Sequence, residues 1–312
     1  MTQRRLVGVA GPAGRGQRVL SLAELREAGV TRQQRRGQVE AERWRRLPHR
    51  GVVIDHGPLD GPNLWRSVLL HVGAEARLGG GTALRAGGLV GLENDPVHIW
   101  VEKSTRKGNP FAELPDVVLH ETRRWGKTDL ADDDGVPRAA IPVAAMQGAL
   151  WARTLREATL FLIMPVQQRL VEPEQLLEQL DRVRRHRFRR ALRPIIADIR
   201  GGSHSMNELD VLDLCRGRGL PEPRRQSLRV GVDGKRYIDA EWPEYGVTLE
   251  VQGAGHGELL RALDDDVRLV ELSTEGSCAV SISVLTLRAN PDAFFRAFAE
   301  LLASRGWLRP AS

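Results

Sequence analysis

The feature that most constrains the fold of this chain is a pair of alternating segments joined by a short turn. Residues 236–242 read Arg-Tyr-Ile-Asp-Ala-Glu-Trp and residues 247–252 read Val-Thr-Leu-Glu-Val-Gln, with Pro-Glu-Tyr-Gly between them. Alternation of apolar and polar residues is typical of a strand with one buried face. The two segments therefore predict an antiparallel hairpin with one polar and one apolar face.

The length of the turn sets the expected register. If residues 243–246 form the loop, Trp242 faces Val247, and by the same count Asp239 faces Glu250. Residues directly opposite each other have Cβ atoms roughly 4.5–5.5 Å apart, and like charges there destabilise a sheet. A divalent cation would offset the repulsion, since Mg²⁺ takes carboxylate and carbonyl oxygens. The alternative is that both carboxylates are only solvated on an open sheet face.

The segments around the hairpin predict a domain over residues 201–312. A Gly-Gly-Ser linker is followed by a helix over 206–216, a strand over 228–232 and the hairpin. We expect a helix over 258–272, a strand over 280–287 and a helix over 291–304 that proline begins and Gly306 ends. The expected order is α-βββ-α-β-α.

The first 58 residues predict a small helical unit followed by a strand. Ser21 caps a first helix with Glu24 at the capping-box position, and Thr31 opens a second helix before an apolar strand over 52–54. This order is typical of a winged helix-turn-helix. The second helix would carry a basic, nucleic-acid-binding set: Arg32, Arg35, Arg36, Arg43, Arg45 and Arg46. The alternative is a helical hairpin whose arginines form a solvated face.

Residues 59–200 predict a mixed α/β middle domain. Helices dominate residues 141–193, with Pro165 and Pro173 as expected breakers, and the domain would end in a basic helix. Seven arginines lie between residues 182 and 193, and Arg184, Arg185 and Arg187 among them are placed to follow a phosphate backbone. A solvated helix face is the alternative. The fold class is therefore mixed α/β and α+β, with several domains.

Charge and cysteine content narrow the functional classes. The formal net charge is +6 and the isoelectric point about 10.0, which favours a polyanionic partner. Cys215 and Cys278 are too few for a disulfide framework or a paired-cysteine zinc site. No apolar run reaches the ~20 residues of a membrane span, and no signal peptide is recognised. We expect a cytoplasmic protein that binds DNA and no membrane.

The C-terminal motifs resemble the very-short-patch-repair-like branch of the PD-(D/E)xK nucleases. The resemblance runs from Ser205 to about Trp307 and includes Ser205-Met206-Asn207-Glu208, the segment 237–242, Leu249-Glu250-Val251-Gln252-Gly253 and His256. It implies a restriction-endonuclease-like fold and an endonuclease that depends on Mg²⁺ or Mn²⁺.

The same resemblance implies roles for individual residues. Asp239 and Glu250 would be metal ligands, with the Val251 carbonyl as a third, and Glu208 would add an acidic contact. Gln252 stands where the family usually has lysine, so it can orient a water but supplies no positive charge. We expect cleavage to be weak or lost unless His256 serves as acid or base.

The first two thirds of the chain resemble the AbiEi-type antitoxins of bacterial abortive-infection systems. The motifs are Leu25-Arg26-Glu27-Ala28-Gly29-Val30-Thr31-Arg32, Arg50-Gly51-Val52, Gly81-Thr82-Ala83-Leu84 and residues 170–176. This resemblance implies operator DNA binding, a role in phage defence and a cognate toxin as partner. Two functions thus remain: a metal-dependent endonuclease, or a non-enzymatic antitoxin or transcriptional regulator that keeps a degenerate nuclease fold.

Overall fold

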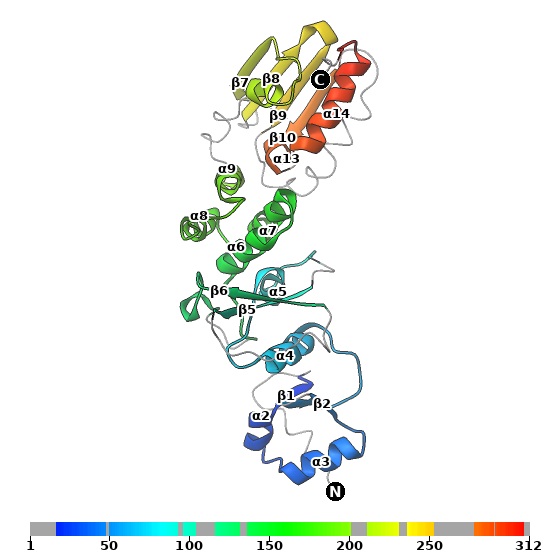
Figure 1. The fold of residues 1–312 in the computed structure, drawn as a ribbon, viewed down its shortest axis with the longest axis vertical. Helices are drawn as coiled ribbons and strands as arrows, with labels where there is room; N and C mark the ends of the chain where they lie inside the picture. The colour runs from blue at the N-terminus through cyan, green and yellow to red at the C-terminus, as the bar shows by residue number, and fades with distance from the viewer. Residues whose placement is uncertain are drawn as a thin grey trace. The chain divides into compact units, whose positions relative to one another are not determined.

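The computed structural model describes residues 17–47, 50–92, 96–103, 116–131, 136–200, 211–230, 236–252, 278–289 and 291–308. The chain divides into two compact units, Met1–Ala144 and Ala145–Ser312 (Figure 1). Both mix helices with small sheets, as expected for the α/β class. The division into residues 1–58, 59–200 and 201–312 stays a prediction.

The first unit begins with a three-stranded antiparallel sheet of order β1-β3-β2. Its elements follow the chain as β1 (Val19–Ser21), α2 (Leu22–Glu27), α3 (Arg32–Glu40), β2 (Arg45–Leu47) and β3 (Gly51–Val53). The predicted caps are confirmed, because Ser21 forms a capping box with Glu24, and Thr31 forms one with Gln34. These caps satisfy backbone N–H groups at the start of each helix.

Helices cover both faces of this sheet. Leu20 and Val52 pack with Leu25 and Trp44 on the side of α2. On the other side lies α4 (Gly61–Val72), as Figure 1 shows. The backbones of the paired strands β3 and β1 lie close together at Gly51, because a Cβ there would lie 2.4 Å from the Leu20 carbonyl oxygen. Only glycine fits at that position.

A second three-stranded sheet of order β4-β5-β6 completes the first unit. The strand β5 pairs antiparallel with β4 and parallel with β6. The elements are β4 (Arg77–Leu78), α5 (Gly80–Ala86), β5 (Val97–Glu102), β6 (Val117–Thr122) and the 3₁₀ turn η1 (Lys127–Asp129). The helix α6 (Ile141–Trp151) follows, and the boundary between the units falls inside it.

The second unit starts with a helical group. It consists of α7 (Leu155–Gln167), α8 (Pro173–Asp181) and α9 (Arg189–Ile199). Pro173 begins α8, but Pro165 lies inside α7, so the expectation that it breaks the helix was wrong. A proline near the end of a helix removes a single backbone hydrogen bond, and the burial of Leu162 and Ile163 outweighs that loss.

The C-terminal sheet has four strands in the order β10-β9-β8-β7, with β10 parallel to β9 and the other pairs antiparallel. Its elements are α11 (Val211–Arg216), β7 (Arg225–Val230), β8 (Arg236–Trp242), the 3₁₀ turn η2 (Pro243–Tyr245), β9 (Val247–Gln252), β10 (Cys278–Ser283), α13 (Val284–Ala289) and α14 (Pro291–Ser304). The helix predicted over 258–272 lies outside the described residues, as does the first half of the helix predicted over 206–216.

Two details of this domain bear on the sequence-based expectations. The strand predicted over 280–287 ends at Ser283, whose hydroxyl accepts a hydrogen bond from the Leu285 N–H and starts α13. Cys215 is buried in α11, and burial raises the pKa of its thiol to about 12. A thiol that stays protonated is a packing residue rather than a nucleophile.

Among the described helices, none combines the length and apolar character needed to cross a lipid bilayer.

Candidate functional site

The register of the C-terminal hairpin is the one predicted from the sequence. Asp239 lies opposite Glu250, Trp242 opposite Val247, and the four-residue connection 243–246 closes with Gly246 at φ +62°. Asp239 and Glu250 are both half-buried. Two carboxylates therefore face each other across neighbouring strands on one face of the sheet.

The opposite face of the hairpin is apolar and fixes this orientation. Ile238, Ala240, Leu249 and Val251 on that face are each exposed by 2% or less. Turning either strand over would expose these side chains and bury the carboxylates. Each fully buried aliphatic side chain contributes about 1.5–3 kcal/mol, so the register is strongly specified.

Trp242 anchors the end of the hairpin. Its indole N–H donates to the Pro221 carbonyl at 2.8 Å, and its ring meets Phe298 of α14 edge to face, with centroids 5.0 Å apart. Phe298 in turn stacks on Phe294 in the same helix. The sheet thus lies firmly on α14, and its polar face points away from this core.

The neighbouring strands extend the acidic pair into a polar row. Ser281 of β10 is the register partner of Glu250, and Ser227 of β7 is the partner of Asp239. The row across the sheet therefore reads serine, glutamate, aspartate, serine. In the backbone register, Arg225 and Arg229 of the edge strand β7 lie opposite Glu241 and Tyr237 of β8. Sequence analysis did not find these neighbours, because strand order cannot be deduced from alternation alone.

The remaining predicted residues of this site are only partly described. Val251 is buried on the apolar face through its side chain, and Gln252 ends β9 opposite Tyr237. Glu208 and His256 lie outside the described residues. Within the described part of the chain, no group of three or more His, Cys, Asp or Glu side chains forms a metal cluster. The described portion of the site is therefore the opposed carboxylate pair.

A second candidate surface lies on α3 in the first unit. The helix has no buried residue, and only Val39 packs partly against the core. Between Thr31 and Leu47 the chain carries six arginines against Glu40 and Glu42. Arg36 forms an exposed ion pair with Glu40 at 2.5 Å. A helix held by its cap and one apolar contact presents nearly all of its surface outward.

The predicted basic helix is shorter than expected. Arg32, Arg35 and Arg36 lie on α3, whereas Arg43 lies in the following turn and Arg45 and Arg46 lie in β2. The helix ends because Trp44 is drawn into the core, where it is 7% exposed. The Arg43 and Trp44 N–H groups close the turn on the Gln38 carbonyl. The six arginines therefore occupy a helix, a turn and a strand.

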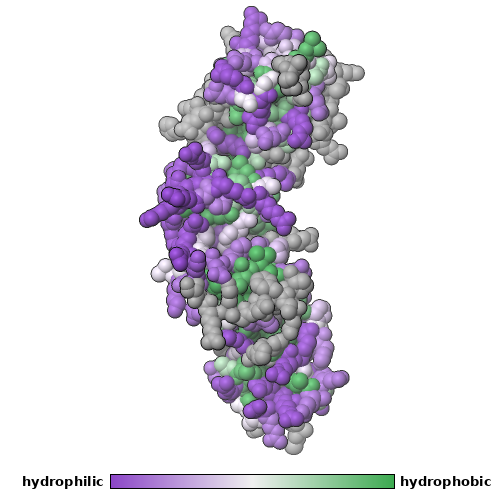
Figure 2. Space-filling view, viewed as in Figure 1, coloured by the Kyte–Doolittle hydropathy of each residue, from purple (hydrophilic) through white to green (hydrophobic). Residues whose placement is uncertain are grey.

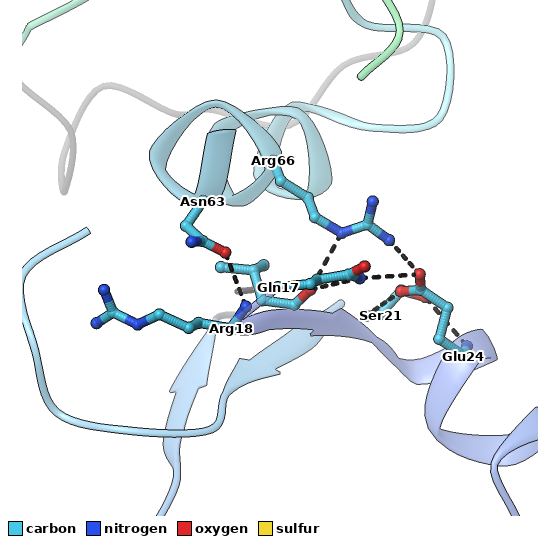
Figure 3. A network of polar contacts seen from close by, with 7 residues as sticks. Gln17, Arg18, Ser21, Glu24, Asn63 and Arg66 are labelled. Carbon is cyan, nitrogen blue, oxygen red and sulfur yellow. Dashed lines mark hydrogen bonds and ion pairs between the residues drawn. The ribbon is translucent and has the colours of Figure 1, made fainter. Parts of the chain in front are cut away.

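Polar contacts fix this sheet to α4, as Figure 3 shows. Arg66 of α4 pairs with the Glu24 carboxylate and donates to the Val19 carbonyl at 3.0 Å. Asn63 of the same helix accepts from the Arg18 N–H at 2.8 Å. Sequence analysis missed this network, because its partners are more than 40 residues apart.

Two carboxyl groups of this region, those of Glu24 and Asp55, have a lowered pKa. Burial raises the pKa of Glu24, but hydrogen bonds from Ser21 and the charge of Arg66 outweigh it and leave the pKa below 4.5. The Arg18 guanidinium, 2.5 Å from Asp55, lowers the pKa of that carboxyl. The β1-β3-β2 sheet and the helices packed on it are thus held together by charged hydrogen bonds as well as by apolar packing.

The arginine-rich segment of the second unit is a loop followed by a helix. Arg184, Arg185 and Arg187 lie in the α8–α9 loop (residues 182–188), and α9 begins at Arg189. The expectation of a basic helix was therefore wrong for these three residues. Val183 is fully buried and pulls the loop inward, which interrupts the helix. Figure 2 shows hydrophilic residues gathered over α8 and α9.

A histidine pair in the first unit was also not predicted. His98 of β5 and His120 of β6 place Nδ1 and Nε2 2.9 Å apart, with ring planes only 15° from parallel. At this distance one nitrogen donates a proton and the other accepts it. The contact depends on parallel pairing of two strands that a long connection separates, so no local pattern signals it.

No protein-family model matches the chain, and no curated protein matches it. One solved structure, described as the crystal structure of the RV2827C protein from Mycobacterium tuberculosis, is similar in part. The two share 19% sequence identity with a TM-score of 0.40, and the match covers 60% of this chain and 73% of the other.

Proposed function

We propose that the chain is a DNA-binding protein whose C-terminal sheet holds a divalent metal ion for phosphodiester hydrolysis. The observation that carries this proposal is the opposed pair Asp239 and Glu250 on one sheet face. Like charges in direct cross-strand pairs destabilise a sheet by a few tenths of a kcal/mol to about 1 kcal/mol. A cation bound by both carboxylates would remove this repulsion, and the free energy recovered would add to the affinity for the metal.

The donor set fits a hard cation. The opposed pair offers carboxylate oxygens from Asp239 and Glu250, and the Val251 carbonyl is adjacent in sequence. Oxygen ligands of this kind suit Mg²⁺ or Mn²⁺. Such an ion supplies Lewis-acid polarisation of a phosphate and lowers the pKa of a bound water.

The residues of the chain divide the remaining work. Asp239 and Glu250 would hold the ion, and the resemblance assigns position 252, a neutral glutamine here, the orientation of a water. Glu208 and His256 are assigned their acidic and acid–base roles only by resemblance. A neutral residue at position 252 makes slow turnover the expected outcome.

The DNA-binding part of the proposal is supported by the first unit. The order strand, helix, helix, strand, strand with a three-stranded antiparallel sheet is compatible with a winged helix. Its second helix, α3, is basic and has no buried residue. An exposed basic helix is accessible to a phosphate backbone, and its arginines carry the charge that such contact needs.

The second candidate function is a non-enzymatic regulator or antitoxin of the AbiEi type. Two features together favour it: the exposed, basic helix α3 and the glutamine at position 252. In that case the first unit would bind an operator, and the C-terminal sheet would bind metal or a toxin without cleavage.

One experiment separates the two functions. Purified full-length protein is incubated with supercoiled plasmid and with single-stranded DNA, in Mg²⁺ or Mn²⁺, beside the variants D239N and E250Q. The enzymatic proposal expects nicking that both variants abolish. The matched control is E241Q, which removes a carboxylate from the same face outside the opposed pair. If the wild type shifts DNA at low salt but never nicks it, the enzymatic proposal fails and the regulator function is favoured.

A further inference from the structure

The seven arginines between residues 182 and 193 fall into two sets, four that have partners in the structure and three for which none is found. Two of the first set hold the α8–α9 loop. Arg187 donates to the Ala152 and Arg153 carbonyls beyond the end of α6, at 2.5 and 3.0 Å, and its guanidinium lies 4.4 Å over the Phe188 ring. Arg189 donates to the Val183 carbonyl at 2.5 Å. These contacts fix the backbone of the loop.

Two more arginines of this segment have partners within the helical group. Arg193 pairs with Asp181, and Arg182 donates to the Gln179 amide oxygen at 2.9 Å. The neighbouring Glu174 pairs with Arg200. Asp181 and Glu174 of α8 are therefore already occupied.

The second set is exposed and faces solvent. It consists of Arg184, Arg185 and Arg190, for which no hydrogen bond or ion pair is found among the residues that the structure describes. Arg153, whose carbonyl accepts from Arg187, is also exposed. The loop and the first turn of α9 thus display three arginines for which no ion pair is found among the described residues.

This loop belongs to the same compact unit as the acidic pair. Helix α9 packs on α13, and the Asp198 carboxylate of α9 pairs with Arg288 of α13 at 2.7 Å. Helix α13 follows β10 directly, and β10 pairs with β9, which carries Glu250. A continuous chain of packed elements therefore joins the loop to the candidate metal site.

We propose that Arg184, Arg185 and Arg190 form a phosphate-backbone-binding surface that holds duplex DNA for the C-terminal site. This inference rests on the proposed DNA-binding function and adds a second contact surface, separate from α3. The α8–α9 loop offers cations and no exposed apolar anchor, since Val183 is buried and Phe188 lies under Arg187. Anchors of protein–protein interfaces combine arginine with buried aromatic side chains, whereas contact with a nucleic-acid backbone depends mainly on positive charge.

The test compares the triple variant R184Q/R185Q/R190Q with the full-length wild type on a fluorescent duplex across a salt series. Each phosphate contact contributes about 0.9 to the slope of log K against log salt. We therefore expect the slope to fall by about 2 to 3 and the low-salt affinity to fall at least about tenfold. The control R193Q removes an exposed arginine that already has a partner, and it should keep the wild-type slope. An unchanged slope in the triple variant overturns the inference.

Two further measurements distinguish this inference from the proposed function and from binding of a polyanion other than nucleic acid. The variant R32Q/R35Q/R36Q tests α3: if it weakens binding while the triple variant does not, the inference fails and the proposed function stands. If wild type binds no duplex at any salt, both fail. Polyglutamate is added as a competitor, and competition equal to that of a duplex of the same charge overturns the nucleic-acid assignment. The melting temperature of each variant verifies that it is folded.

Discussion

Asp239 and Glu250 lie directly opposite each other on neighbouring antiparallel strands, on the face of the sheet that points away from α14. Their neighbours in the same row are serines, so the row carries two negative charges side by side. Like charges in directly opposed positions lower the stability of a sheet, and a cation bound by both carboxylates would offset that cost. We therefore expect the effect of a substitution to depend on metal.

The first prediction concerns this sign. Without divalent metal, D239N and E250Q should be as stable as wild type or more stable, by up to about 1 kcal/mol, because like-charge repulsion is removed. With saturating Mg²⁺ or Mn²⁺ the wild type should gain stability and the variants should not. Urea unfolding in EDTA and in metal measures both. Metal stabilisation of wild type that survives in both variants would place the ion elsewhere.

The second prediction concerns position 252. If the sheet retains a hydrolytic site, Q252K should raise the rate of plasmid nicking, because lysine adds positive charge that glutamine lacks. The double variant Q252K/D239N should be inactive and serves as the control. An increase that persists in the double variant would indicate a contaminating nuclease. If Q252K binds metal as wild type does and still does not nick, the regulator function is favoured.

Much of this site could be predicted from sequence because the relevant information is local. The four-residue turn fixes the register, and alternation assigns Asp239 and Glu250 to one face and Ile238 and Val251 to the other. The caps at Ser21 and Thr31 were likewise predictable, since a side chain and a backbone N–H three residues later form the contact. Nothing beyond neighbouring residues was needed for these features.

Other features depend on packing that no local pattern reports. The strands β1 and β2 have only three residues each, which is too short for alternation to be recognised. Arg45 and Arg46 leave the helix because Trp44 is needed in the core. The alternation after Val280 continues past the end of β10, so the change to α13 is set by the Ser283 cap. Contacts between distant segments, such as Asp198 with Arg288, were also invisible.

The third prediction concerns that ion pair. The Asp198 and Arg288 side chains are 1% and 16% exposed, so removing one partner leaves a charge in a nearly dry site. R288L should destabilise the protein by about 3–5 kcal/mol, whereas the double variant D198L/R288L should recover much of that loss. Equilibrium unfolding of both single variants and the double variant gives the coupling energy. Additive effects would mean that the two side chains do not depend on each other.

The fourth prediction concerns Trp242. W242F keeps a ring against Phe298 but removes the donor to the Pro221 carbonyl, and it should cost about 1–3 kcal/mol. W242A also removes the ring and should cost more, about 3–5 kcal/mol. Chemical denaturation monitored by circular dichroism measures both. Equal losses for the two variants would show that the hydrogen bond accounts for the whole effect and that the edge-to-face contact adds nothing.

The last prediction concerns the pH dependence of the first unit. The pKa of Glu24 lies below its ordinary value of 4.5 in the folded state, because bonds from Ser21 and Arg66 outweigh the opposing effect of burial. A depressed pKa means that the unfolded state binds the proton more tightly. The stabilisation from the charged Glu24 is therefore fully present above pH 4.5 and is lost as the pH falls through the lower, folded-state value. E24Q should lower stability at neutral pH and reduce the loss on acidification, measured as the unfolding free energy between pH 7 and pH 3. The hydrogen bond with Arg18 lowers the pKa of Asp55 in the same direction, so D55N is the matched comparison. Its effect should be smaller, because the Asp55 side chain is 44% exposed. A wild type and an E24Q variant with parallel pH profiles would show that the charge on Glu24 contributes no stability through Ser21 and Arg66.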